Sequence, residues 1–126
     1  MGDQLRYAID AELCIVELLG PDGPSPKEVE QVLKAVVADS DFRPGCGFLR
    51  DRRGFQMQPV GLVHGLSRVI RELPEIQESR WAVVVSDQGN YGMTRMLQIL
   101  ADLTELRIFE DPDLAKRWLA SPSAQS

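Results

Sequence analysis

The chain has 126 residues, of which 44% are apolar and 26% charged, as in a single globular domain. Its formal net charge of −5 argues against nucleic acid or an anionic membrane surface as a partner, because both attract basic surfaces. The N-terminus shows no signal peptide, and no apolar run reaches the roughly 18 residues of a membrane span. We therefore predict a cytoplasmic location.

The chain opens with a predicted hairpin. Residues 5–9 have larger apolar side chains at every second position, as a half-exposed strand does, and residues 13–19 form a second, more apolar strand. A helix follows, because Ser25 suits the capping position and Pro26 the first helical position. Residues 47–51 are then predicted to form a short third strand.

The next part of the chain repeats the helix-strand unit. Pro59 opens a helix with a continuous apolar stripe, and Pro74 is expected to end it. Residues 81–85 are apolar at every position, which is typical of a strand covered on both faces. A third helix is predicted to begin near Asn90, and residues 105–109 form the fifth strand.

A last helix begins at Pro112, and residues 121–126 form a small polar tail after a single domain of residues 1–120. The residues of this helix expected to face inward are Leu114, Trp118 and Leu119. Strands joined by single helices pair in parallel. The sequence thus predicts an α/β fold: a five-stranded, mostly parallel sheet with an antiparallel first strand and four helices.

Two loops bring polar residues to the carboxyl ends of the strands, where ligands gather in open α/β sheets. They are residues 51–54 and 87–92, and the second runs into a helix N-terminus, which favours an anion. Arg52 or Arg53 would supply charge there. The alternative is that these side chains only satisfy loop backbone and solvent. The candidate partner- or ligand-binding residues are Asp51, Arg52, Arg53, Gly54, Asp87, Asn90, Tyr91 and Gly92.

A second candidate site is an apolar pocket between helices and sheet, lined by Met93, Met96 and Leu97. At helical spacing the same residues also suit an ordinary core, so both interpretations stay open. Gly61 and Gly65 lie four residues apart in the second predicted helix, where glycine lowers helix propensity. They indicate close packing against a neighbouring element or, alternatively, the approach of a partner or ligand.

No catalytic, metal or cofactor motif is complete. Gly89 and Gly92 are too close for a dinucleotide fingerprint, and the spacing of a phosphate-binding loop is missing. His64 and Ser67 lie within a helix instead of at a strand-helix elbow, and His64 is expected to be exposed. Cys46 is a weak nucleophile candidate without an obvious base. We therefore predict a protein that is not an enzyme and needs no cofactor.

The two cysteines, Cys14 and Cys46, are interpreted as small buried side chains, the commoner use of cysteine in an intracellular protein. The chain has no Cys-x-x-Cys pair and one histidine, so no zinc site is expected. If the protein were an enzyme after all, perturbed side chains of Asp51, Asp87 or Cys46 would be the place to look.

Several short strings spread over nearly the whole chain resemble bacterial SpoIIAA-like proteins, small domains described as STAS- or Sec14-like. The strings are Phe42-Arg43-Pro44-Gly45, Phe48-Leu49-Arg50-Asp51-Arg52-Arg53-Gly54, Tyr91-Gly92-Met93 with Met96, and Arg107-Ile108-Phe109-x-Asp111 leading to Ala115-x-x-Trp118-Leu119. The resemblance implies a superhelix of β-α units. Its Sec14-like side implies an apolar ligand held between helices and sheet.

The anti-sigma-factor antagonists of the STAS group carry a phosphorylatable Ser or Thr at the start of the helix after the third strand. Residues 51–59 contain neither, although Asp51 keeps an acidic residue at the strand end. The resemblance therefore implies a non-catalytic regulatory or protein-interaction domain without the phosphorylation switch. The alternative is a small carrier of an apolar or lipid-like ligand. A homodimer is also expected, since helices gathered on one face would leave residues such as Val84 uncovered on the other.

Overall fold

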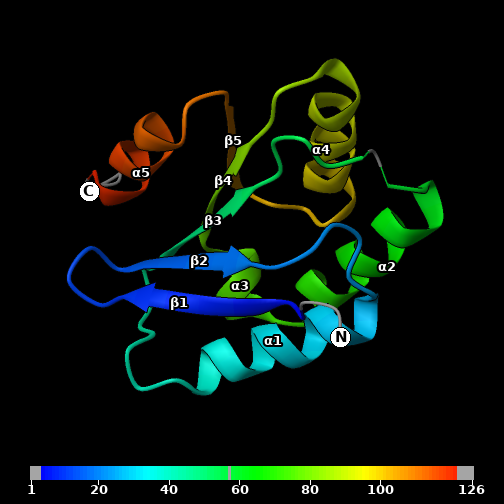
Figure 1. Cartoon of the computed structure of the whole chain (residues 1–126). Coiled ribbons are helices and arrows are strands. Elements are labelled where there is room, and N and C mark those ends of the chain that lie inside the picture. The colour runs from blue at the N-terminus through cyan, green and yellow to red at the C-terminus, as the bar shows by residue number, and fades with distance from the viewer. Residues whose placement is uncertain (1–3, 57, 122–126) are drawn as a thin grey trace.

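The computed structural model describes residues 4–56 and 58–121, which form five strands and five helices (Figure 1). The first four elements are β1 (Arg6–Asp10), β2 (Ile15–Leu19), α1 (Pro26–Ala38) and β3 (Gly47–Asp51). The next three are α2 (Val60–Arg71), α3 (Pro74–Gln77) and β4 (Arg80–Val84). The last three are α4 (Gln88–Leu100), β5 (Glu105–Phe109) and α5 (Pro112–Ala120).

The predicted α/β fold is confirmed. The strands form one sheet in the order β1-β2-β3-β4-β5, with β1 antiparallel to β2 and every other pair parallel. Each strand therefore pairs with the next one along the chain, and the chain advances across the sheet in one direction. The carboxyl ends of β2, β3, β4 and β5 meet at one edge, together with the start of β1.

The larger core lies on the sheet face covered by α1 to α4. Phe48 from β3 and Trp81 from β4 are its aromatic centre, with ring centroids 4.8 Å apart in a stacked arrangement. The Trp81 indole nitrogen donates a hydrogen bond of 3.0 Å to the carbonyl oxygen of Ile76 in α3. This bond satisfies the one polar group of a ring that is only 5% exposed.

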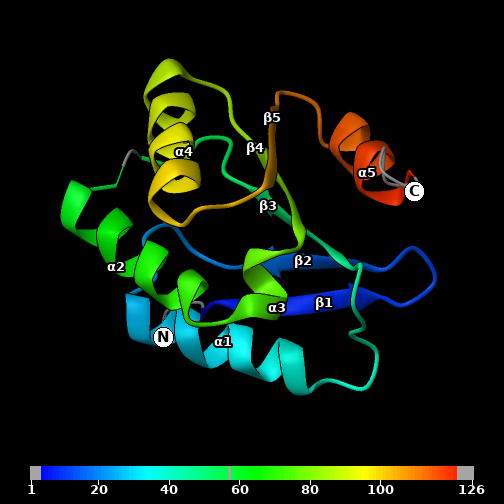
Figure 2. The ribbon, with the colours of Figure 1, turned by 180° about the vertical axis from the view of Figure 1, so that it is seen from behind.

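The opposite face of the sheet is covered by α5, which packs on β3 and β4. In both ribbon views α5 lies on one side of these strands, with α2 and α4 on the other (Figures 1 and 2). Leu49, Val84 and Leu119 are buried in this second, smaller core. Since Val84 is fully buried within one chain, the uncovered face that led us to expect a homodimer does not exist.

The helix prediction is wrong at two points. Pro74 does not simply end α2, because it also occupies the first position of the one-turn helix α3, so there are five helices and not four. The helix expected to begin near Asn90 is α4, which begins at Gln88 because Asp87 accepts the Asn90 N–H and caps it. Leu114 was expected to face inward but is 49% exposed, while Ala115 and Leu119 are buried.

The cysteine prediction is also wrong, because Cys14 and Cys46 form a disulfide. Parallel pairing of β2 with β3 brings the two residues together, and the Gly47 N–H donates to the Cys14 carbonyl oxygen at 2.9 Å. The cytosol keeps most thiols reduced, so this bond does not fit the expected cytoplasmic location. Within the described residues, no helix has the length and apolar character needed to cross a bilayer.

Candidate functional site

The candidate loops lie at the carboxyl edge of the sheet, as predicted. Ligands of open α/β sheets bind where the strand order reverses and neighbouring loops diverge. This sheet has no such reversal within its parallel strands, because β2 to β5 follow in chain order. One cavity lies on the helix-covered face, and two more open hollows lie at the edge itself, one beside Arg50 and Asp51 and one beside Asp87 and Tyr91.

Arg52 and Asn90 form a buried link between the loop after β3 and the start of α4. The Arg52 Nε and one terminal nitrogen donate to the Asn90 Oδ1 at 3.2 and 3.1 Å. The Asn90 amide nitrogen donates to the Phe55 carbonyl oxygen at 2.8 Å and to Asp87 at 2.9 Å. Since Arg52 is 8% and Asn90 1% exposed, these two predicted binding residues hold the loop and α4 together.

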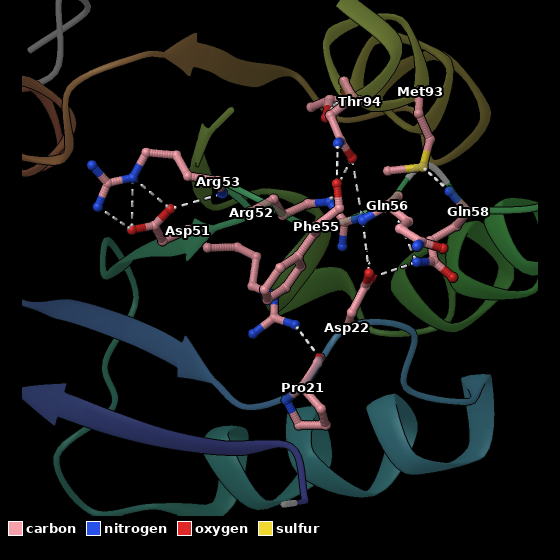
Figure 3. Close-up of polar contacts among 12 residues, drawn as sticks. Pro21, Asp22, Asp51, Arg52, Arg53, Phe55, Gln56, Gln58, Met93 and Thr94 are labelled. Carbon is pink, nitrogen blue, oxygen red and sulfur yellow. Dashed lines mark hydrogen bonds and ion pairs between the residues drawn. The ribbon is translucent and has the colours of Figure 1, made fainter. Parts of the chain in front are cut away.

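Asp51 and Arg53 form a bidentate ion pair on the surface (Figure 3). Their closest oxygen and nitrogen are 2.8 Å apart. The hydrogen bonds from Arg53 hold the pKa of the Asp51 carboxyl below its usual value. Gly54 follows with φ +80°, and nothing lies within 4 Å of the place where a Cβ would sit.

Asp87, Tyr91 and Gly92 lie at the N-terminal end of α4. The N–H of Asn90 donates to Asp87 at 2.8 Å, and this bond lowers the pKa of the Asp87 carboxyl. Tyr91 is 42% exposed and stacks with Arg95 on the next turn of the helix. Asp87 therefore has a capping role, whereas Tyr91 and Gly92 are accessible to a partner.

A cavity of about 100 Å³ lies between the sheet face and helices α1, α2 and α4. The predicted pocket residues Met93 and Leu97 line it, but Met96 does not. Most of the other lining side chains are apolar and come from both the strands and the helices: Leu5, Leu18, Pro24, Val29, Leu62, Val63, Leu66, Ile70, Trp81 and Val83. The polar contributions come from Arg50, Arg52, Gln58 and Thr94.

Arg50 is a functional candidate that the sequence analysis missed. It follows Phe48 by two residues on β3, so its side chain lies on the same core face, and it is only 9% exposed. Its terminal nitrogens donate to the carbonyl oxygens of Leu18 at 3.3 Å and Pro21 at 2.8 Å. The available signal was the two-residue periodicity, which places a charged side chain on the buried face of a central strand.

Arg50 and Arg52 lie close to each other in the lining of the cavity. Both guanidinium carbons are 5.1 Å from the centroid of the Phe55 ring. Burial and the neighbouring charge of Arg52 lower the pKa of Arg50 to about 10, so the guanidinium stays charged at neutral pH. Arg52 is paired with Asp22, whose nearer carboxylate oxygen is 3.6 Å away, and Figure 3 shows Asp22 beside it.

The residues considered for catalysis are not brought together. His64 is exposed on α2, and the Ser67 hydroxyl donates to the His64 carbonyl oxygen at 2.7 Å, not to its ring. Cys46 is held in the disulfide and has no thiol to act as a nucleophile. In the part of the chain that the structure describes, no group of three or more His, Cys, Asp or Glu side chains has the arrangement of a metal site.

Comparison of the chain with protein-family models, with curated proteins and with solved structures finds no match. The resemblance to SpoIIAA-like proteins therefore remains a prediction.

Proposed function

We propose that this domain binds a small apolar molecule in the cavity between the sheet and helices α1, α2 and α4. The observation that carries this proposal is a void of about 100 Å³ bordered mainly by apolar side chains. Ligand sites are typically apolar spaces with a few polar groups at defined positions, and here those groups are gathered around the two buried arginines. The role is that of a carrier or sensor domain without catalysis.

The cavity is partly open to solvent, and its apolar walls lack the contacts that a filled space would give them. Apolar cavities also stay free of water, and an engineered one of about 150 Å³ binds benzene. The present cavity is smaller, so it suits a short alkyl chain better than a larger ring system. A ligand of this kind would recover the lost packing energy.

Filling the cavity should abolish binding without unfolding the domain. Val63 of α2 lines the cavity and is 2% exposed, so Val63→Phe places additional carbon atoms in the space. We expect this variant to bind 1-pentanol at least about tenfold more weakly in titration calorimetry, because the ring takes the place of the ligand. Unchanged affinity in a folded Val63→Phe protein would contradict the proposed function.

The matched control is Val60→Phe, one turn earlier on the same helix. Val60 is 58% exposed and does not line the cavity. The substitution makes the same chemical change at the surface. The affinity of the Val60→Phe variant for 1-pentanol should therefore remain that of the unmodified protein. Circular dichroism of both variants verifies that the fold is retained.

A second candidate function is protein interaction through the edge formed by Gly54, Gly61, Tyr91 and Gly92. The observation that favours it is that an added Cβ at any of the three glycines would meet no atom within 4 Å. Packing within the chain therefore does not explain the glycines at positions 61 and 92 inside helices. In contrast, a Cβ at Gly65 would lie 2.7 Å from the Pro26 ring, so close packing accounts for that residue.

Charge reversal at Arg53, the exposed residue next to Gly54, tests the interaction surface. Arg53 is exposed and its partner Asp51 is also on the surface, so Arg53→Glu should preserve the fold while placing two like charges side by side. Capture of a protein partner on immobilised domain should fall several-fold. Arg52 is unsuitable for this test because it is buried and hydrogen-bonded to Asn90. Equal capture by Arg53→Glu and unmodified protein would eliminate this edge as the partner surface.

A further inference from the structure

We infer that the ligand of the cavity is a monoanion, a short-chain carboxylate whose carboxyl group is bound by Arg50. This inference rests on the proposed function, since it assigns the chemical class of the molecule in the same site. It starts from the charges at the carboxyl edge of the sheet and from the position of Arg50 between the cavity and that edge.

Three arginines lie at the end of β3 and in the loop that follows it, and Arg50 is the one without an ion pair. Arg52 has Asp22 as its carboxylate partner, and Arg53 has Asp51. Within the described residues, no carboxylate oxygen lies within 4 Å of the Arg50 guanidinium. Asp22 and Asp51 therefore attract Arg50 only from beyond contact distance, while a second cation, Arg52, lies nearby. A bound anion would supply a counter-ion in direct contact.

The guanidinium of Arg50 has more N–H donors than it has acceptors in the structure. It carries five N–H groups, and the structure gives it hydrogen bonds to two acceptors, the carbonyl oxygens of Leu18 and Pro21. These two bonds fix the direction of the side chain and leave further N–H groups for an anion. A site whose charged group is oriented in advance loses little conformational entropy when the ligand binds.

Arg50 is also placed where an amphipathic molecule would present its polar end. Its strand neighbours in register are Leu18 and Val83, and all three residues line the apolar cavity. Arg50 lines a second, more open hollow at the sheet edge as well, together with Leu19, Gly20 and Phe55. The walls of the cavity are almost entirely apolar, whereas the second hollow has polar walls to which Glu17, Asp51 and Arg53 also contribute. Since Leu18 and Arg50 border both spaces, an alkyl chain in the cavity would have its head group in the second hollow, beside the guanidinium.

The charge balance favours a carboxylate over a phosphate. The formal charges of the three arginines and of Asp22 and Asp51, which pair with two of them, sum to one positive charge. A carboxylate carries one negative charge and matches a single guanidinium fork. A phosphate monoester carries nearly two charges at neutral pH, and the nearby aspartates would repel the excess.

The test compares three probes of equal chain length, pentanoate, 1-pentanol and pentyl phosphate, by titration calorimetry at pH 7.5. We expect pentanoate to bind about tenfold or more tightly than 1-pentanol, because a charge-assisted hydrogen bond is added. Pentyl phosphate should bind more weakly than pentanoate. Equal affinities for pentanoate and 1-pentanol would overturn the inference and leave the proposed function standing, whereas no binding of any probe would overturn both. Tighter binding of pentyl phosphate would overturn the assignment of a carboxylate.

Arg50→Met keeps the length of the side chain and removes its charge. In this variant the ratio of the affinities for pentanoate and 1-pentanol should fall to about one. The matched control is Arg95→Met on α4, which removes an exposed charge outside the cavity lining and should keep the preference. If Arg50→Met does not fold, Arg50→Lys should retain a reduced preference. A full preference in folded Arg50→Met would overturn the assignment of this residue.

Discussion

Trp81→Ala should lower the free energy of unfolding by about 3–5 kcal/mol, the usual range for removing a buried aromatic ring. Trp81 is 5% exposed, stacks on Phe48 and donates its indole N–H to Ile76. The substitution removes all three contributions at once. It also enlarges the cavity, because Trp81 is one of the lining residues. The effect should therefore lie at the upper part of the range for core substitutions.

Urea unfolding followed by far-ultraviolet circular dichroism measures this loss. Tyr91→Ala is the matched control, since it also removes a large aromatic ring but from a side chain that is 42% exposed. We expect a change of less than about 1 kcal/mol there, as is usual for surface substitutions. A loss below about 1 kcal/mol for Trp81→Ala would mean that β4 is not a central strand with this ring in the core.

Removal of the Cys14–Cys46 disulfide is expected to cost about 3–4 kcal/mol. The bond closes a loop with a sequence separation of 32 residues, and cross-linking a loop of that length restricts the unfolded chain by about this amount. The loop contains β2 and α1, so its restraint acts on one whole strand-helix unit. Cys14→Ala with Cys46→Ala should show the loss without disturbing the carboxyl edge, because the bond lies at the opposite ends of β2 and β3.

Unfolding in urea with and without dithiothreitol measures the contribution of the bond in the unmodified protein. The double alanine variant is the control for the reductant, and its unfolding midpoint should not change. Thiol titration of the unfolded, non-reduced protein should find no reactive thiol. Two reactive thiols in protein purified without reductant, or no effect of dithiothreitol, would contradict the disulfide and restore the original interpretation of the cysteines.

The sheet could be predicted from the sequence because its signals are local. The apolar run of β4 and the capping residues around Ser25 and Asp111 each depend on a few neighbouring residues. Pro74 shows where local signals fail, since proline is compatible both with the end of one helix and with the first turn of the next. The disulfide could not be deduced in this way, because it depends on the pairing of β2 with β3.

The sequence predicts which strand ends carry the candidate residues, but not how their side chains are buried. The sequence places Arg50, Arg52 and Arg53 at the end of β3, but it does not decide which of them are buried. Arg52 turned out to be structural and Arg53 exposed, while Arg50, which was not selected, lies on the core face. Similarly, Met93 and Leu97 line the cavity and Met96 does not, because one helical face points to only one side. These outcomes depend on tertiary packing.

Methyl NMR spectroscopy tests the presence of a ligand site in the cavity most directly. Titration of the labelled protein with 1-pentanol should shift the methyl signals of Val63, Val83 and Leu97, which line the cavity, and produce nuclear Overhauser contacts from these methyls to the alkyl chain. The methyls of Val60 and Ile99 are exposed, at 58% and 79%, and should not respond. Contacts confined to exposed methyls, or no response of the cavity methyls at saturating probe, would contradict a ligand-binding role.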